Sequence, residues 1–242
     1  MSLVITVAQQ KGGSGKTTLA AHLSVAWASP QRVEASRFKP GLKVLAVDLD
    51  PQESFCRWSE VRGQSVAGAS SLDVRGQPDL TSPEELIAER QDADIILIDM
   101  PQASHASASG IFSASNIVLV PLQLSPMDLW ATAPTIEAIK EAGSNPLVVL
   151  NRVPAHARLS DTVIAEAKGM GWRVANTCLG NRIVFASSLM VGKGVTEDAP
   201  SSLAAAEIRL LAREVLAAAR AQADVHESDR PDDSAFSRLN SH

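Results

Sequence analysis

The sequence of 242 residues has few cysteines, no long apolar run and no excess of basic residues. Two cysteines, Cys56 and Cys178, are too few and too far apart for a disulfide framework or a cysteine-rich metal site, and they fit a reducing cytoplasm. Every apolar stretch is much shorter than the run of about 18 residues that a membrane-spanning helix needs. Residues 1–8 contain no basic region and no cleavage site, so we expect no signal peptide.

The net charge of −5 argues against a wholly basic nucleic-acid-binding protein. Residues 224–242 contain five acidic residues and two arginines, which leaves a charge of only −2 for residues 1–223. A local basic patch is compatible with such a body. The acidic segment is also polar and interrupted by proline, so it predicts a disordered tail after a single domain of residues 1–223.

Short apolar runs alternate with segments of helical pattern. Nearly continuous valine, isoleucine and leucine predict strands buried on both faces at 3–8, 43–47, 95–98, 117–120 and 147–150. Helices are expected at 17–28, 54–61, 83–90, 128–142, 161–169 and 202–223. This alternation predicts an α/β fold in which one doubly wound, mostly parallel sheet lies between helices. The polar stretch 29–41 is longer than the connection between a helix and the next strand requires.

Residues 9–18 read QQKGGSGKTT and follow the first expected strand directly. They almost form the phosphate-binding loop G-x-x-x-x-G-K-[ST], except that Gln10 occupies the position of the first glycine. Backbone amides of such a loop, together with the start of the next helix, bind phosphate oxygens. Lys16 then reaches the β- and γ-phosphates of a nucleotide, and the hydroxyl of Thr17 suits Mg²⁺. The residues expected to bind the nucleotide here are Gly12, Gly13, Ser14, Gly15, Lys16, Thr17 and Thr18.

Carboxylates follow two of the expected strands. The segment KVLAVDLDPQ places Asp48 and Asp50 just past a strand, where an open parallel sheet binds ligands, although an ordinary turn explains this pair equally well. The segment ADIILIDMP carries Asp99 after an apolar strand, which is the Walker B pattern. The Asp99 carboxylate should hold Mg²⁺ through water.

Lys11 is a second lysine that the ordinary phosphate loop does not require. With it, the block KGGSGKTT resembles the deviant Walker A loop of the ParA/MinD class of ATPases, in which the early lysine crosses a dimer interface to the partner's nucleotide. The resemblance implies that Lys11 and Lys16 act on the phosphates during catalysis. It also implies that Asp50 orients the attacking water and that Asp48 supports the metal. Met100 departs from the family, which usually has a polar residue after the Walker B aspartate.

Two later segments, VLVPLQLSPMDLWAT and VLNRV, extend the resemblance to about residues 1–223. It implies that Asn151 reads the edge of the adenine, since an amide offers both a donor and an acceptor. It also implies that Arg152 stacks on the base or supports its binding. Without the family, an Asn-Arg pair after a strand is as typical of a turn or a helix cap. The whole chain resembles a small ParA-type ATPase without the additional N-terminal DNA-binding module of some members.

The resemblance implies a function as well as a fold. It implies a cytoplasmic, nucleoid-associated ATPase that uses ATP and Mg²⁺ and forms a homodimer around two ATP molecules. By the same resemblance, the dimer binds DNA without sequence preference and leaves it after hydrolysis. A ParB-like adaptor on a cargo stimulates hydrolysis, which is slow without that adaptor. The cargo is open between a plasmid, a chromosome locus, a chemotaxis cluster and a carboxysome. No membrane partner is expected.

The expected helix at 202–223 carries a stripe of arginines. At about 100° per residue, Arg209, Arg213 and Arg220 lie within about 40° of one another. An apolar face lies roughly opposite, formed by Ile208, Leu211, Val215 and Ala218. A solvated helix face explains the arginine stripe equally well, but ParA relatives bind DNA through basic residues near their C-terminal helices. We therefore predict that these three arginines contact DNA.

Two other functions remain open. A MinD-like ATPase binds membrane through a basic amphipathic C-terminal helix, whereas residues 224–242 are acidic and interrupted by proline. A metabolic ligase that phosphorylates a small carboxylate uses the same loop, and its turnover rises with its metabolite. The nitrogenase-reductase branch requires paired cysteines for an iron–sulfur cluster, and Cys56 and Cys178 do not supply that pattern.

Overall fold

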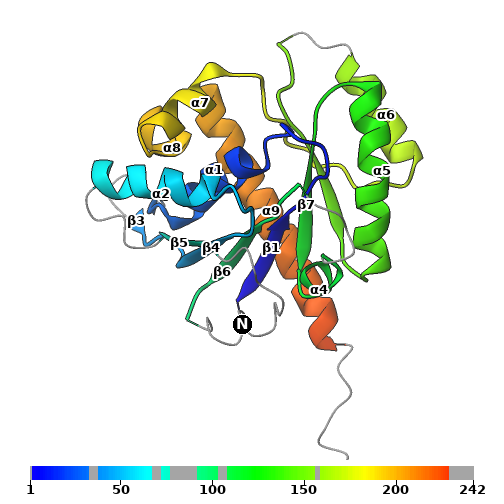
Figure 1. The fold of residues 1–242 in the computed structure, drawn as a ribbon, viewed down its shortest axis with the longest axis horizontal. Coiled ribbons are helices and arrows are strands. Elements are labelled where there is room, and N and C mark those ends of the chain that lie inside the picture. The colour runs from blue at the N-terminus through cyan, green and yellow to red at the C-terminus, as the bar shows by residue number, and fades with distance from the viewer. Residues whose placement is uncertain are drawn as a thin grey trace, which may run out of the picture.

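The computed structural model describes residues 2–32, 38–66, 72–76, 92–102, 108–155 and 159–228. A six-stranded sheet forms its centre, with the strand order β5-β4-β6-β1-β7-β8, and every pair of neighbours is parallel (Figure 1). The strands are β1 (Leu3–Val7), β4 (Val44–Asp48), β5 (Leu72–Gly76), β6 (Ile95–Asp99), β7 (Ile117–Leu122) and β8 (Pro146–Leu150). The predicted α/β fold with a parallel sheet is confirmed.

Helices cover both faces of this sheet (Figure 1). One face packs against α1 (Lys16–Ala28), α2 (Ser54–Ser65), α7 (Ile183–Met190), α8 (Val195–Asp198) and α9 (Leu203–Ser228). The other face packs against α4 (Ser109–Ser113), α5 (Pro126–Glu141) and α6 (Leu159–Gly169). Between α1 and β4, a two-stranded hairpin forms from β2 (Gln31–Arg32) and β3 (Phe38–Lys39). The helix expected at 83–90 lies outside the described residues.

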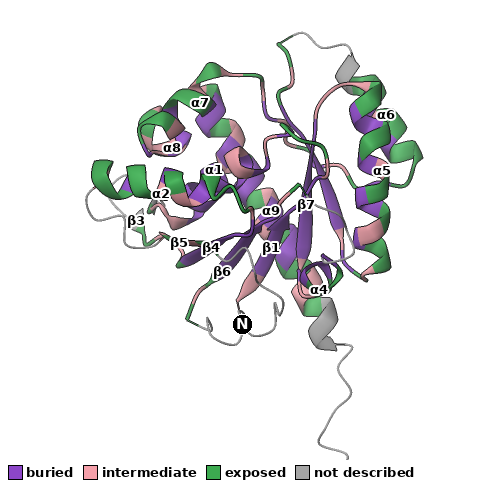
Figure 2. Cartoon of the chain, viewed as in Figure 1, coloured by how far each residue is buried: buried purple, intermediate pink, exposed green. Residues whose placement is uncertain are grey.

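The central strands are buried on both faces, which explains their continuous apolar sequence (Figure 2). In β6, Ile95 and Leu97 pack into the cluster beneath α1 and α9, whereas Ile96 and Ile98 pack into the cluster beneath α4, α5 and α6. Strand β5 is different, because it lies at the edge of the sheet and none of its residues is buried. Its mixed sequence LDVRG gave no strand signal.

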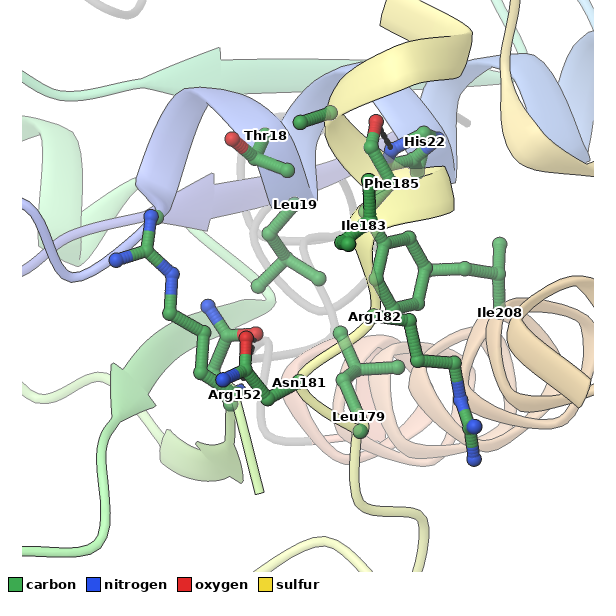
Figure 3. A pocket seen from close by; sticks show the side chains of 14 residues that line it. Thr18, Leu19, His22, Arg152, Leu179, Asn181, Arg182, Ile183, Phe185 and Ile208 are labelled. Carbon is green, nitrogen blue, oxygen red and sulfur yellow. Dashed lines mark hydrogen bonds between the residues drawn. The ribbon is translucent and has the colours of Figure 1, made fainter. Parts of the chain in front are cut away.

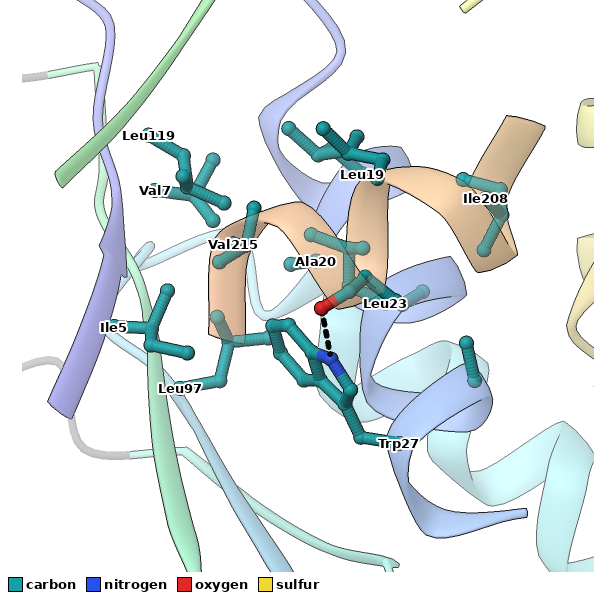
Figure 4. Packing of buried hydrophobic residues seen from close by; sticks show 14 of the residues in the cluster. Ile5, Val7, Leu19, Ala20, Leu23, Trp27, Leu97, Leu119, Ile208 and Val215 are labelled. Atoms are coloured by element: carbon teal, nitrogen blue, oxygen red, sulfur yellow. Dashed lines mark hydrogen bonds between the residues drawn. The ribbon is translucent and has the colours of Figure 1, made fainter. Parts of the chain in front are cut away.

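The last helix, α9, packs along α1 (Figure 4). Its predicted apolar face is buried, as the solvent exposure of Ile208, Leu211, Val215 and Ala218 shows. The indole Nε1 of Trp27 in α1 donates a hydrogen bond to the carbonyl oxygen of Ala212, at 3.1 Å. Helix α9 extends to Ser228 rather than ending at Ala223, and the rest of the predicted tail lies outside the described residues. Within the described part of the chain, no helix is long and apolar enough to span a membrane.

Candidate functional site

The glycine-rich loop joins β1 to α1 at the carboxyl edge of the sheet, where β1 lies between β6 and β7. Gly13 and Gly15 have φ angles of 73° and 92°, in the left-handed region that glycine adopts most readily. Gly15 is also the N-cap of α1, so the first amides of that helix point toward the loop without helical partners. A loop of this shape at a helix N-terminus binds anions.

Lys16 is a buried cation at this loop, with a solvent exposure of 9%. Its Nζ donates a hydrogen bond to the carbonyl oxygen of Gln9, at 3.0 Å. Burial lowers the pKa of Lys16, and the carboxylates of Asp99 and Asp50 oppose this effect. A phosphate group would supply the stronger counter-charge that a buried ammonium requires.

Thr17 and Asp99 meet beside Lys16. The hydroxyl of Thr17 donates a hydrogen bond to Oδ2 of Asp99, at 2.6 Å. Within the described structure, Oδ1 of Asp99 is buried and has no hydrogen-bond partner. Burial raises the pKa of Asp99 to about 7, against the hydrogen bond from Thr17. A buried carboxylate with an unused oxygen, next to a hydroxyl, fits Mg²⁺. The ion prefers oxygen ligands, and its positive charge would balance the charge of the buried carboxylate.

Asp48 ends β4 directly opposite Asp99 in the register of the sheet. Its Oδ1 accepts a hydrogen bond from the amide of Asp50 at 3.0 Å, and its Oδ2 accepts from the amides of Phe55 and Cys56 at 2.9 and 3.2 Å. Both oxygens of Asp48 are therefore occupied by backbone amides, one by that of Asp50 and the other by two amides at the start of α2. Asp48 fixes the segment that carries Asp50, while its predicted support of the metal stays a prediction.

Asp50 lies between Asp48 and α2 and is half-buried. Its Oδ1 accepts a hydrogen bond from the amide of Gln52, at 2.9 Å. The Asp50 carboxylate is close enough to affect the pKa values of both Lys16 and Asp99. The structure thus brings together the predicted phosphate loop, Walker B aspartate and water-orienting aspartate from three separate segments.

Lys11 forms an ion pair within its own chain, with Asp128 in the first turn of α5. The side chain of Lys11 stays 41% exposed. Behind it, the buried Gln9 donates through Nε2 to the hydroxyl of Thr132 at 2.8 Å, and Thr132 donates to the carbonyl oxygen of Asp128 at 2.7 Å. The phosphate loop is therefore attached to the start of α5, a contact that no sequence pattern predicts.

Asn151 holds the phosphate loop from the end of β8. Its Nδ2 donates to the carbonyl oxygen of Ser14 at 2.8 Å, and its Oδ1 accepts from the amide of Arg152 at 2.9 Å. Arg152 itself has a φ of 53°, which marks a sharp change of chain direction. The contact with Ser14 explains why an amide side chain suits position 151 without a base present. The predicted reading of adenine by Asn151 stays a prediction.

A pocket opens beside the loop, with α1, α7, α9 and the segment before α7 around it (Figure 3). Its polar rim includes Thr18, Asn151, Arg152 and Asn181, and apolar side chains complete the wall, namely Leu19, Leu179, Ile183, Phe185 and Ile208. An apolar slot with a few polar groups next to a phosphate loop suits a flat heterocyclic base. Sequence reasoning missed Asn181 and Phe185, since no motif marks the segment that carries them.

His22 lies in the wall of this pocket and connects α1 with α7 and α8. Its Nδ1 accepts a hydrogen bond from the amide of Val195 at 3.1 Å, so Nε2 carries the hydrogen and donates to the carbonyl oxygen of Phe185 at 3.0 Å. Burial lowers the pKa of His22 from 6.5 to about 4. Protonation would place a second hydrogen against the Val195 amide, so the neutral form is the one that fits.

Acidic pH is therefore expected to destabilise the fold through His22. Between pH 6.5 and 4 the unfolded chain binds a proton that the folded chain does not, so stability decreases as the pH falls through this window. At about pH 5 the contribution of His22 should be about 2 kcal/mol less favourable than at about pH 7.5. Urea unfolding at both values should show a smaller pH dependence for His22→Gln than for the wild type. Equal pH dependence in the two proteins would contradict this role.

The predicted arginine stripe does not form one uniform surface. Arg209 donates through Nη1 to the carbonyl oxygen of Pro200 at 2.8 Å, so its guanidinium lies against the loop before α9. Arg213 and Arg220 are exposed, and both line one hollow on the outer side of α9. Whether any of the three contacts DNA stays a prediction.

Comparisons with known proteins agree with this geometry. Residues 5–190 match the family model described as CobQ/CobB/MinD/ParA nucleotide binding domain. The chain is 28% identical to maintenance of carboxysome distribution protein A of Halothiobacillus neapolitanus, with 89% of this chain and 97% of that protein covered. It is 26% identical to the chromosome-partitioning ATPase Soj of Thermus thermophilus, with 88% of this chain and 95% of that protein covered.

A solved structure shows the same fold. Apo McdA from Cyanothece superposes with a TM-score of 0.69 at 17% identity, over 89% of this chain and 100% of that one.

Proposed function

Because the chain belongs to the CobQ/CobB/MinD/ParA nucleotide-binding domain family, we propose that it is a ParA-type, Mg²⁺-dependent ATPase that positions a cargo on the nucleoid. The observation that carries this proposal is the phosphate loop with Lys11 added to it. Lys16, Thr17 and Asp99 converge below that loop, and Lys11 stands on its exposed side. This arrangement suits a nucleotide that is held by one subunit and contacted by a second.

Each of these residues has a distinct part in the proposed hydrolysis. Lys16 neutralises charge on the β- and γ-phosphates, and Thr17 with Asp99 would hold Mg²⁺, which balances the charge that develops on the leaving phosphate. Asp50, held by Asp48 next to this cluster, orients the attacking water. Asn151 and Arg152 border the pocket that would take the adenine.

Dimerisation is proposed to depend on Lys11. A charge that reaches the partner's phosphates makes ATP a bridge between two copies of the chain, so dimerisation responds to the γ-phosphate. The dimer would bind DNA without sequence preference and leave it after hydrolysis, which a ParB-like adaptor on the cargo stimulates. The chain would work in the cytoplasm, on the nucleoid, with slow turnover when the adaptor is absent.

The cargo is not selected by the residues of the site. Of the two relatives compared, one is named for carboxysome distribution and the other for chromosome partitioning, and their identities to this chain differ little, at 28% and 26%. The names of these relatives therefore favour a carboxysome or a chromosome locus as the cargo. A plasmid and a chemotaxis cluster remain further candidates.

Two rival functions use the same nucleotide site. A MinD-like ATPase would bind a membrane surface, and a ligase would phosphorylate a small carboxylate. The exposed arginines Arg213 and Arg220 favour a polyanion as the partner over a small metabolite.

One experiment separates these functions. The wild type should bind unrelated DNA duplexes tightly with ATP, and far more weakly with ADP or without nucleotide, because the dimer doubles the number of phosphate contacts. Arg213→Glu should lose DNA binding and keep ATP-dependent dimerisation, whereas Arg230→Glu, outside the described residues, should change little. Bio-layer interferometry at two salt concentrations measures this, with liposomes as a parallel arm. Binding to liposomes alone would favour the MinD-like function, and stimulation of turnover by a metabolite would favour the ligase.

A further inference from the structure

Within the stretch 29–41, which is longer than its connection requires, β2 and β3 pair with each other, and the chain after β3 returns to the sheet. The end of this stretch is fixed against α1 by two contacts. The amide of Leu42 donates to the carbonyl oxygen of Trp27 at 2.9 Å. At Gly41 the backbone approaches α1 so closely that a Cβ there would lie 1.8 Å from the carbonyl oxygen of Ala28. The position of Lys39, two residues before Gly41, is therefore set by α1.

Helix α1 in turn fixes Lys39 relative to α9. Trp27, which receives the Leu42 hydrogen bond, donates from its indole to Ala212 on α9. As a result Lys39 shares a hollow with Arg213 and Arg220, over a floor formed by Pro40, Leu42, Leu216 and Ala217. Three cations from two segments far apart in the sequence therefore surround one depression.

The charge of this hollow is not neutralised inside the described structure. The side chains of Lys39, Arg213 and Arg220 have no hydrogen-bond or ion-pair partner among the described residues. The two acidic residues of α9 that precede Arg220 are used elsewhere. Glu207 binds Arg182, and Glu214 accepts hydrogen bonds from the backbone amides of residues 176 and 177.

We infer that Lys39 joins Arg213 and Arg220 in a single phosphate-binding surface for DNA, in which the hairpin lysine takes the place of Arg209. This inference rests on the proposed DNA binding and adds to it a residue and a function for the long stretch 29–41. Arg213 and Arg220 are about 10.5 Å apart along α9, well beyond the axial spacing of about 3.4 Å between successive phosphates of one strand, so they contact different phosphates. Lys39 lies beside them and contacts the same backbone.

The test measures DNA affinity of the ATP-bound protein as a function of salt. Each lysine–phosphate contact contributes about 0.9 to the slope of log affinity against log salt, so Lys39→Gln should lower the slope by about 1.8 in a dimer. At about 0.1 M salt this corresponds to an affinity about 60-fold weaker. Arg209→Gln should change neither value, because its guanidinium is bound to Pro200.

Lys168→Gln is the matched control, since Lys168 is exposed at the end of α6, on the opposite face of the sheet. Thermal unfolding and ATP binding of each variant report on folding independently of DNA. An unchanged salt slope in Lys39→Gln, with a reduced slope in Arg213→Gln, would overturn the inference and leave the proposed function standing. A wild type that ignores DNA in the presence of ATP would overturn both, and binding of anionic vesicles in place of DNA through these residues would also reject this inference.

Discussion

Lys16→Ala is expected to abolish tight binding of Mg-ATP. Lys16 is a largely buried ammonium that donates a hydrogen bond to the carbonyl oxygen of Gln9 and lies near the carboxylates of Asp99 and Asp50, and the β- and γ-phosphates would add charged groups that bind it directly. Removing one partner of a buried, hydrogen-bonded charge pair costs about 2–5 kcal/mol, which corresponds to an affinity about 30-fold to several thousand-fold weaker. Isothermal titration calorimetry with ATP, in the presence and absence of Mg²⁺, measures this directly.

Two further variants make this experiment specific to the phosphate loop. Lys16→Gln keeps most of the side chain and removes the charge, so it should lose nearly as much affinity as Lys16→Ala. Thr17→Ala removes the hydroxyl that meets Asp99, so it should weaken the Mg²⁺-dependent part of binding and spare the rest. Undiminished Mg-ATP affinity in Lys16→Ala would show that residues 9–18 are not a nucleotide-binding loop.

Much of this fold was predictable because five of its six sheet strands consist almost entirely of buried residues. Continuous apolar sequence is the direct consequence of that burial, and it located β1, β4, β6, β7 and β8. Strand β5 was not predicted, because an edge strand with no buried residue has no such constraint. Helices α4, α7 and α8 are short, with 5, 8 and 4 residues, and too short to show a clear helical period.

The phosphate loop and Asp99 were predictable for a different reason, which is that each is a local pattern directly after a strand. What could not be predicted are contacts between segments distant in the sequence, such as Lys11 with Asp128 or Lys39 with the arginines of α9. No periodicity encodes such a pair. Met100 shows a third case, since the residue that departs from the family is buried in the core cluster beneath α4, α5 and α6, where an apolar side chain is suitable.

Asp48 shows that a correct location does not establish a role. The sequence placed it at the end of a strand beside the metal-binding residues, and the structure agrees with that location. Its oxygens, however, are occupied by backbone amides of Asp50 and of the start of α2. Asp48→Asn would therefore change the position of Asp50 as well as the charge beside Asp99, so it cannot separate the two roles.

Dimer formation and turnover are expected to separate in a variant of Lys11 and a variant of Asp50. Lys11→Ala should bind ATP normally, because Lys16 and the loop amides remain, but it should stay monomeric. Asp50→Ala should bind ATP and dimerise, while hydrolysis becomes about 100-fold slower or more, since the attacking water loses its orienting carboxylate. Light scattering in saturating Mg-ATP gives the mass of each variant, and phosphate release gives its turnover.

The ion pair of Lys11 with Asp128 makes the Lys11 prediction sharper. Lys11 is 41% exposed, but the side chain of Asp128 is only 9% exposed, so moving Lys11 to a partner's triphosphate leaves a buried carboxylate without its cation, which opposes dimerisation. Asp128→Asn should then dimerise with ATP at least as well as the wild type, because it removes only the competing partner. Lys11→Ala combined with Asp128→Asn should remain monomeric like Lys11→Ala. A dimeric Lys11→Ala, or a monomeric Asp50→Ala in saturating ATP, would contradict a dimer joined through its nucleotides, because the charge that links the two subunits would then come from elsewhere.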